Sequence, residues 1–591
     1  MHKKALLFSV LAFTMFRATA QTTYIPMGSD NYLLLDRLET RSGKLCDSLS
    51  LGDKMESRMH AVKFLEKIQA DTANTGRYSK IDMFNLQQMI GENGEWTQDE
   101  NGFIKSKHPL FKKIYKDRYN FGYVKTKDFM LIINPVINEV STIDKYSGKG
   151  SVSMNNLDGY HLYNSHDLEF RGWFGKKLGF YTMLTDNIES LPGYVYNYAV
   201  NDGKHMRVPG ADYFLAPDLI KNPGGRFNYY NASAYIDFAA VKDKVNVTLG
   251  NGRNFIGDGV TSLFLTDASS NMPFLRMRAR VWRLNYDALY LQLTSPYNKF
   301  SGDQVYNHKY ATMHYISFNA ARWLTVSYFE SIVFTRSNNG FELNYVNPVA
   351  FTLAANNFNG SGDKSLIGWS FKAIAAKHFQ FYGQFMLNEF KASEVFGGKG
   401  WYGNKYGIQL GGKYFDAFGI RNLDLQAEMD MVRPYAYAAK DTVQNYTNYN
   451  QPLADPLGSG FIKMYGIARY QPAKNFTITL KAMSYVKGVD TGSANYGNDI
   501  FKSYTTATKQ YGVKMVNGPK TQVTSLNINL SYQAARNFFI DAGMIVRNYD
   551  NSNKVYNGYS TVGYDPAGQL SANVIYLGIR LNSPRRDYSF F

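Results

Sequence analysis

The segment FQFYGQFMLNEF, residues 379–390, alternates two kinds of side chain. Phenylalanine and leucine recur at the odd positions, interrupted by Gly383, while glutamine and asparagine recur at the even ones. A period of two is that of a β-strand with two different faces. Its length is close to the roughly ten residues that a tilted strand needs to cross a bilayer, whereas strands of soluble sheets usually have about five or six. The segment therefore predicts a membrane-crossing strand.

The same alternation recurs along the chain from about residue 124, for example in LDLQAEMDM (423–431) and LNINLSYQ (526–533). Grouping these segments predicts eight hairpins, at 161–185, 226–251, 275–295, 311–334, 366–390, 405–432, 461–487 and 522–548. Single strands near 127–134 and 572–582 bring the total to about eighteen. An even number of strands returns both termini to the same side of a barrel.

The connections between these strands are of two kinds. Turns such as that in FNAARWLTV (318–326) are short and contain small and basic residues, whereas 186–225 and 433–460 are long and polar. Short turns at one end and long loops at the other are typical of outer-membrane barrels. The fold class predicted is an all-β transmembrane barrel with a small, mainly helical N-terminal region. A large soluble β-protein with the same hairpin bias is the alternative.

The first twenty residues, MHKKALLFSVLAFTMFRATA, combine two lysines, an apolar run and small residues at the end. This pattern indicates a signal peptide at 1–20. No later stretch of about 18 apolar residues could form a transmembrane helix, and an exported chain without one can still span a membrane as a closed barrel. We expect the outer membrane of a Gram-negative bacterium. The lone Cys46 excludes an internal disulfide.

Residues 21–120 differ from the rest, because LGDKMESRMHAVKFLEKIQAD (51–71) and SKIDMFNLQQMI (79–90) have helical spacing of apolar residues. We expect a mainly helical region that either plugs the lumen or hangs beneath it in the periplasm. The barrel is then expected at 121–591.

Charged residues on the predicted strands suggest a lumen site. In LRMRARVWRLNY (275–286), arginines occupy every second position, and LDLQAEMDM carries an acidic row in the same way. An arginine on the lipid face costs about 2–4 kcal/mol at the bilayer midplane, so both rows are expected to point inward. They could form internal ion pairs, the role we favour, or a track for an anionic ligand such as a polysaccharide. The candidate residues are Arg276, Arg278, Arg280, Asp424, Glu428 and Asp430.

Catalytic motifs are not found. The chain contains no GxSxG, HExxH or Walker sequence, and the glycine-rich GNGRNFIGDG (250–259) precedes a strand-like segment rather than a helix that could hold a phosphate. No enzymatic activity, cofactor, metal or nucleic-acid partner is expected. In predicted exposed loops, Tyr402, Tyr446 and Tyr449 could stack on sugar rings, although such tyrosines more often pack the loop itself.

The glycine-rich stretch nevertheless belongs to a longer pattern. GNGRNFIGDGVTSLFLTDASSNMPFLRMRARVW (250–282) resembles the signature region of the Wzi-like capsule-assembly family. TYIPMGSDNYLLLDRLETRSG (23–43) is similar to the start of those proteins, and GWYGNKYGIQLGGKYFDAFGIRNLDLQAE (400–428) resembles a Bacteroidota branch labelled gliding-motility RemB-like. The matching residues of the signature are Gly257, Gly259, Ser262, Leu263, Leu265, Thr266, Asp267, Pro273, Leu275 and Arg276.

This resemblance implies an outer-membrane barrel of about eighteen strands with periplasmic helices, which holds surface polysaccharide without enzymatic activity. The leading hypothesis is therefore a protein that anchors or organises surface polysaccharide or gliding-related structures, with outer-membrane lipid, polysaccharide and gliding or surface-export machinery as partners. A porin-like channel for anionic solutes is the alternative. A lipid A or phospholipid hydrolase would need a Ser/His constellation on the outer wall.

Overall fold

The computed structural model describes residues 23–71, 76–97, 119–150, 158–175, 177–200, 207–212, 225–296, 306–336, 340–348, 352–360, 362–551 and 568–589. The signal peptide expected at 1–20 lies outside these ranges. In the described part of the chain, no helix is both long and apolar enough to cross a membrane.

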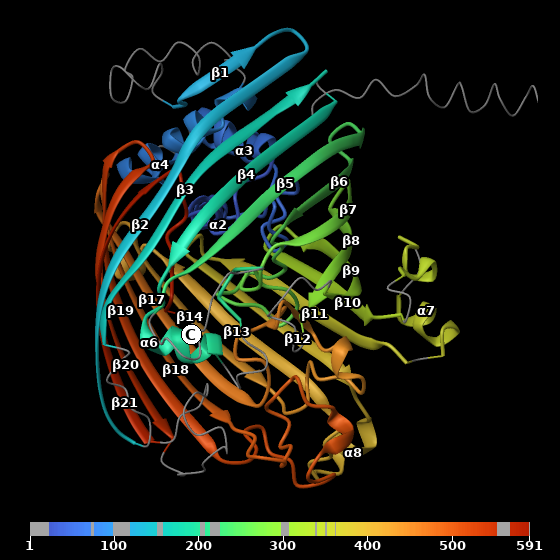
Figure 1. The fold of residues 1–591 in the computed structure, drawn as a ribbon. Helices are drawn as coiled ribbons and strands as arrows, with labels where there is room; N and C mark the ends of the chain where they lie inside the picture. The colour runs from blue at the N-terminus through green and yellow to red at the C-terminus, as the bar shows by residue number, and fades with distance from the viewer. Residues whose placement is uncertain are drawn as a thin grey trace, which may run out of the picture.

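The strands form one antiparallel sheet that closes on itself (Figure 1). Each strand pairs with its neighbours in chain order, and β2 pairs with β21 from Ile137↔Leu581 to Gly150↔Gly568 to complete the circle. The short β1 (Gly122–Lys125) is added to β2 at one rim, so the nineteen-stranded sheet is an eighteen-stranded barrel plus β1. The barrel strands are β2 (Phe129–Gly150), β3 (Gly159–Phe174), β4 (Leu178–Glu189), β5 (Phe227–Val241), β6 (Val245–Gly252), β7 (Met272–Val281), β8 (Leu284–Ser295), β9 (Asn307–Ala321), β10 (Leu324–Phe334), β11 (Lys364–Ala375), β12 (Phe379–Glu389), β13 (Lys405–Phe415), β14 (Leu423–Val432), β17 (Phe461–Ala473), β18 (Phe476–Gly488), β19 (Lys520–Ala535), β20 (Phe538–Asn551) and β21 (Gly568–Leu581).

The predicted fold class and the eight hairpins are confirmed, and β2 is the element that the prediction misjudged. It continues to Gly150, far past the expected end at 134. Pro135 comes directly after that expected end, and it lies between the stretch of β2 that pairs with β1 and the stretch that pairs with β21. Its carbonyl faces that gap and accepts a hydrogen bond from Asn582 Nδ2 at 2.8 Å. The missing N–H of proline therefore falls where the ladder is already interrupted.

Alternation along the strands separates two environments. Apolar side chains on the outer face remain exposed, including Ile143, Leu184, Leu249 and Ile575 at 57–63%. Between them, polar side chains such as Asn138 and Asp287 point into a lumen that buries them. An apolar outside and a polar inside is the arrangement of barrels that lipid surrounds.

The N-terminal region folds as a small helical unit inside one end of the barrel (Figure 1). We call residues 23–97, as far as they are described, the plug. It contains α2 (Asn31–Ser42), α3 (Arg58–Ala70) and α4 (Lys80–Glu92). Ser57 caps α3, and Ser79 and Asp82 form a capping box at the start of α4. Leucines of all three helices share an apolar core whose members lie between residues 25 and 90.

The other end of the lumen is crossed by the long connections. The motif loop (residues 253–271, between β6 and β7) and the tyrosine loop (residues 433–460, between β14 and β17) fold inward and bury leucine and tyrosine side chains together. The short helix α6 (Gly193–Val200) packs nearby against β5, β20 and β21. Another helix, α7 (Thr352–Phe358), lies outside the wall beside β9 and β10 (Figure 1).

The C-terminal end departs from the expectation that both termini stay on the short-turn side. Beyond β21, the tail (residues 582–589) turns into the lumen and runs back toward the long loops. Arg586 Nη2 donates to Glu189 Oε2 at 3.0 Å, and Glu189 ends β4 at the long-loop rim. Tyr194, the first of three tyrosines of α6, donates from its hydroxyl to the Tyr588 carbonyl at 3.2 Å. Strand counting located the end of the barrel and could not predict the path of the tail.

Candidate functional site

The plug contacts the barrel wall on opposite sides of the lumen. Its polar side chains contact strands from β3 to β17. In a closed sheet whose strands follow chain order, these strands lie on opposite sides of the lumen. The pairs are Arg58–Glu169 on β3 (3.4 Å), Tyr24–Asp237 on β5 (2.6 Å), Asp53–Arg278 on β7 (2.9 Å), Glu39–Lys372 on β11 (2.9 Å), Asp36–Lys413 on β13 (2.6 Å), Arg37–Asp424 on β14 and Asn85–Gln471 on β17 (2.8 Å). The plug therefore occupies the lumen rather than hanging below it.

The predicted arginine row is part of this contact. Arg276 and Arg278 point inward and are buried, and both share Asp53 of the plug and Asp287 of β8. Arg280 donates to Asn285 Oδ1 at 2.7 Å and lies 2.7 Å from His60 Nδ1. Burial and the neighbouring arginine lower the pKa of His60 to about 2, so this imidazole is neutral and can accept the hydrogen bond.

The predicted acidic row has other partners. Asp424 pairs with Arg37 of the plug, and Asp430 lies 3.2 Å from Lys463 Nζ. Glu428 accepts hydrogen bonds from the Tyr382 hydroxyl and the Val260 N–H, both at 2.7 Å. The structure therefore does not bring the arginine row and the acidic row together: both rows contact the plug, and the acidic row also contacts the motif loop (residues 253–271) through Val260.

The signature residues build the motif loop. Leu263 and Leu265 are fully buried, and the Leu263 N–H donates to Gln384 Oε1 at 2.8 Å. Gly259 has room for no side chain, because a Cβ there would lie 2.5 Å from Glu428 Oε2. Thr266 N–H donates to the Leu453 carbonyl at 2.7 Å and so joins the motif loop to the tyrosine loop.

The remaining signature residues lie in three places. Ser262 and Gly257 lie in the same turn of the motif loop. Pro273 and Leu275 lie on β7, and Asp267 lines a cavity.

Tyr446 corrects an expectation about the tyrosine loop. It was expected in an exposed loop, but it is fully buried in the lumen and its hydroxyl donates to the Phe264 carbonyl at 2.8 Å. The neighbouring Tyr437 makes the same kind of bond to the Leu263 carbonyl. Tyr402 and Tyr449 are half-buried. The hydroxyls of Tyr437 and Tyr446 donate hydrogen bonds to backbone carbonyls of the motif loop. Buried tyrosine hydroxyls need such partners, which explains why a connection that folds inward contains tyrosines.

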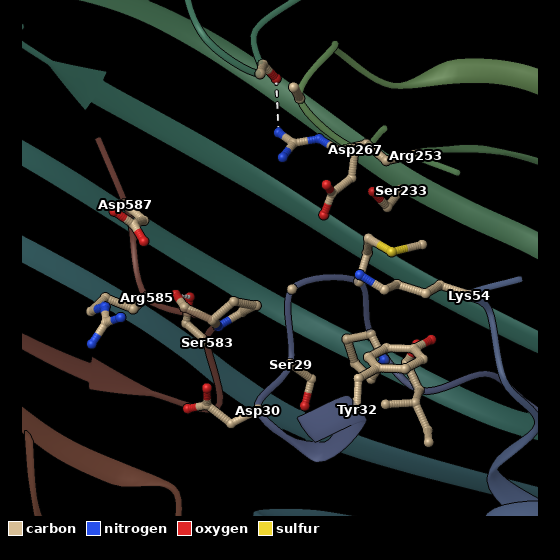
Figure 2. A pocket seen from close by; sticks show the side chains of 18 of the residues that line it. Ser29, Asp30, Tyr32, Lys54, Ser233, Arg253, Asp267, Ser583, Arg585 and Asp587 are labelled. Carbon is tan, nitrogen blue, oxygen red and sulfur yellow. Dashed lines mark hydrogen bonds between the residues drawn. The ribbon is translucent and has the colours of Figure 1, made fainter. Parts of the chain in front are cut away.

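A cavity of about 530 Å³ remains between the plug, the tail and the motif loop, and we call it the chamber (Figure 2). Its wall comes from β2 to β5 on one side and from β13 to β18 on the other. Tyrosines and asparagines of β3, β4 and β5 line it together with charged groups of the plug and the tail. The charged residues at its border include Asp30, Lys54, Arg253, Asp267, Arg469, Arg585 and Asp587.

Two groups of charges face each other across the chamber (Figure 2). On one side Lys54 lies against the Phe255 ring, 3.5 Å from its centroid, and burial lowers the pKa of this ammonium. Arg253 on the same side donates to the Gly210 carbonyl at 3.0 Å. On the other side Asp30, at the start of α2, faces Arg585 of the tail. Sequence reasoning missed this second group, for which the adjacent arginines in the final SPRRDYSFF were the available signal.

The described residues offer no metal site, since no three His, Cys, Asp or Glu side chains among them gather closely enough. On the outer wall, His314 Nδ1 lies 3.0 Å from Glu330 Oε1, and the Thr352 N–H at the start of α7 donates to the same oxygen at 2.7 Å. Within the described ranges no serine hydrogen-bonds to this pair.

Comparisons with known proteins give a likeness of fold. No protein-family model matches the chain, and no curated protein matches it. Among solved structures, Wzi from Escherichia coli, described as an outer-membrane protein involved in group 1 capsule assembly and a carbohydrate-binding β-barrel, is 12% identical with a TM-score of 0.52, over 94% of this chain and 99% of that one. A BenF-like porin from Pseudomonas fluorescens Pf-5 (9% identity, TM-score 0.42) and OpdQ from Pseudomonas aeruginosa (7%, 0.39) each match 76% of this chain and 98% of their own.

Proposed function

We propose that this protein is a non-enzymatic outer-membrane barrel that holds polysaccharide at the surface of a Gram-negative cell. The observation that carries the proposal is the plug, whose ion pairs and hydrogen bonds reach the wall from β3 to β17, as a scaffold rather than an open pore requires. The fold likeness to a carbohydrate-binding barrel over nearly the whole of both chains supports it. The plug is then periplasmic and the long loops are extracellular, as in barrels of this class.

The other functions considered from the sequence make different demands. A porin-like channel for anionic solutes needs a continuous water path, and the plug and the two inward-folded loops stand across it. A lipid hydrolase needs a nucleophile beside a base on the outer wall, where His314 and Glu330 are covered by α7. A role in organising gliding-related surface structures uses the same scaffold and differs only in the partner that is held.

A deletion strain separates these functions. We expect it to synthesise polysaccharide normally but to release it, so that the cell-attached fraction falls while the total amount is unchanged. Complementation with the intact gene restores attachment, and surface motility is scored in the same strains. Unchanged attachment together with lost motility would transfer the proposal to gliding structures, and unchanged attachment with normal motility would refute both.

A conductance measurement tests the channel directly. The refolded full chain in a planar bilayer should give no steady current, because the plug is held by buried contacts. Large steady currents from the intact protein would refute the scaffold interpretation and favour the porin-like channel.

A further inference from the structure

One corner of the chamber gathers four cations around Asp30. Arg469 of β17, Lys481 of β18, Arg580 of β21 and Arg585 of the tail lie close enough to Asp30 for each to act on its charge. Two of these cations have their own carboxylates, because Arg580 Nε lies 2.7 Å from Asp541 and Lys481 pairs with Asp587. Asp30 and, from β14, Asp424 are the carboxylates that act on the other two cations, and Asp424 is already paired with Arg37.

The two remaining guanidiniums, those of Arg469 and Arg585, have no carboxylate of the described residues in direct contact. Arg585 donates to the amide oxygen of Asn529, and among the described residues it has no carboxylate at ion-pair distance. No carboxylate of the described residues lies within ion-pair distance of Arg469: Asp30 and the cross-strand Asp424 attract it only from farther away, and the positive charge of Arg585 repels it. Two like charges that share a confined, wet space and have no carboxylate in direct contact favour the entry of an anion.

Asp30 is not in direct contact with Arg469 or Arg585 and does not take the place of that anion. Its nearest cation is Arg580, at 3.9 Å, and its side chain keeps 74% of its exposure, which shows that the corner is wet. Enclosure inside the lumen would by itself raise the pKa of Asp30, but the positive charges of Arg580, Arg469 and Arg585 outweigh it and hold that pKa below its usual value. The carboxylate is therefore ionised and solvated, and space for a second anion remains between it and the two guanidiniums.

We propose that Arg469 and Arg585 bind the oxyanion of a small acidic sugar, either a carboxylate or a phosphate, inside the chamber. Planar guanidiniums match both groups with paired N–H donors. The volume of about 530 Å³ suits one or two sugar rings. The polar wall offers further contacts: Arg586 lies over the Tyr163 ring at 5.1 Å, and the Tyr163 hydroxyl donates to Asn187 at 3.0 Å.

This inference stands independently of polysaccharide attachment, because the chamber lies inside the lumen and the proposed attachment uses the cell surface. The ligand could be a free acidic monosaccharide or the acidic end of a longer glycan. Both present the same oxyanion to the arginines, so the experiment includes a monomer and an oligomer.

Isothermal titration of the detergent-solubilised full chain tests the site. The probes are galacturonate, glucose 6-phosphate, a galacturonate trimer and, as the neutral control, glucose. We expect the acidic sugars to bind and glucose not to bind. The affinity should fall at least tenfold in Arg469→Gln and in Arg585→Gln, and in 0.5 M salt relative to 0.05 M salt, because the contact is ionic. A trimer that binds as well as the monomer identifies a glycan end as the ligand, and a trimer that does not bind identifies the free sugar.

Variants that keep the charge guard against misfolding. Arg469→Lys and Arg585→Lys should fold like the original chain and retain part of the affinity, whereas Lys63→Gln, which removes an exposed cation of the plug, should bind normally. The absence of acidic-sugar binding by the unmodified chain would overturn the proposal, as would equal affinity in the doubly substituted Gln variant when it shows the circular dichroism of the original. Neither result affects attachment of polysaccharide, which is measured in cells.

Discussion

Replacing Arg37 by methionine should loosen the plug more than the removal of any single exposed contact would. Arg37 extends from α2 toward the turn that joins β13 to β14. Its Nε donates to Asp82 at 2.7 Å within the plug, and its two Nη atoms reach Asp416 and Asp424 of the barrel. Its side chain is only 6% exposed, so these charges are not screened by solvent. One side chain therefore joins two plug helices to two wall positions.

The size of the effect follows from the charges that remain. Arg37 and Arg41 face Asp82, Asp416 and Asp424, which is a net charge of −1. Removing Arg37 makes it −2 and leaves buried carboxylates without their main partner. Breaking a buried pair in this way costs about 3–5 kcal/mol. Since 1.36 kcal/mol corresponds to a factor of ten, opening of the plug should increase roughly 10²- to 10⁴-fold.

Hydrogen–deuterium exchange of peptides from α2 and α4 measures that opening. Arg37→Met should accelerate exchange there while the barrel strands remain protected. Adding Asp424→Asn restores the net charge of −1 and should recover part of the loss, as coupled residues do in a double-mutant cycle. Burial would raise the pKa of Asp416 but Arg37 holds it low, so in Arg37→Met this carboxyl binds protons more readily and the destabilisation should shrink as the pH falls from 8 to 5.

The control is Lys63→Ala, which removes a plug–wall pair of 3.5 Å whose side chains are 50% and 36% exposed. Such exposed pairs contribute about 0–1 kcal/mol. Exchange in α2 that rises no further in Arg37→Met than in this control would refute the reasoning that buried ion pairs hold the plug.

Two further predictions concern the long-loop end. Leu263→Ala in the motif loop leaves a void at a fully buried position and should cost about 2–5 kcal/mol, seen as earlier protease cleavage of that loop, whereas Leu343→Ala at an 80% exposed position should change nothing. Burial raises the pKa of Asp490 to about 6, so the loop it stabilises by accepting the Tyr496 N–H should become more stable as the pH falls from 7 to 5. In Asp490→Asn, which keeps the acceptor, this pH dependence of hydrogen exchange (corrected for the intrinsic rate) should disappear.

The barrel was predictable because its strands are specified locally. A period of two in segments such as 379–390 fixes both the strand and the face that meets lipid, and neighbouring strands pair in chain order with short turns. The long β2 was not predictable, since the tolerance of Pro135 depends on a gap between β1 and β21 that no local pattern encodes. The inward orientation of the arginine row could be argued from the cost of placing charge in lipid.

The partners of that row could not be predicted, because they are set by tertiary structure. Asp53 lies more than two hundred residues before Arg276 and comes from the plug, whose docking depth the sequence does not state. The prediction that Tyr446 is exposed was wrong for a related reason. A polar, tyrosine-rich loop is expected to be exposed unless the carbonyls that accept hydrogen bonds from its tyrosines are known. The path of the tail also depends on a distant residue, Glu189 at the rim of β4.

The way in which the plug is attached explains why its contacts are charged. The plug has a complete apolar core of its own, made of residues such as Leu35, Leu65 and Leu86. A barrel in lipid keeps its apolar side chains outside, so the wall offers the plug mostly polar groups. Docking can therefore use ion pairs and hydrogen bonds but little apolar burial. Undocking would expose charges to water rather than a hydrophobic core, and its cost is set by the few pairs that are fully buried. For this reason a single substitution at Arg37 should move the plug while leaving both its own fold and the barrel intact.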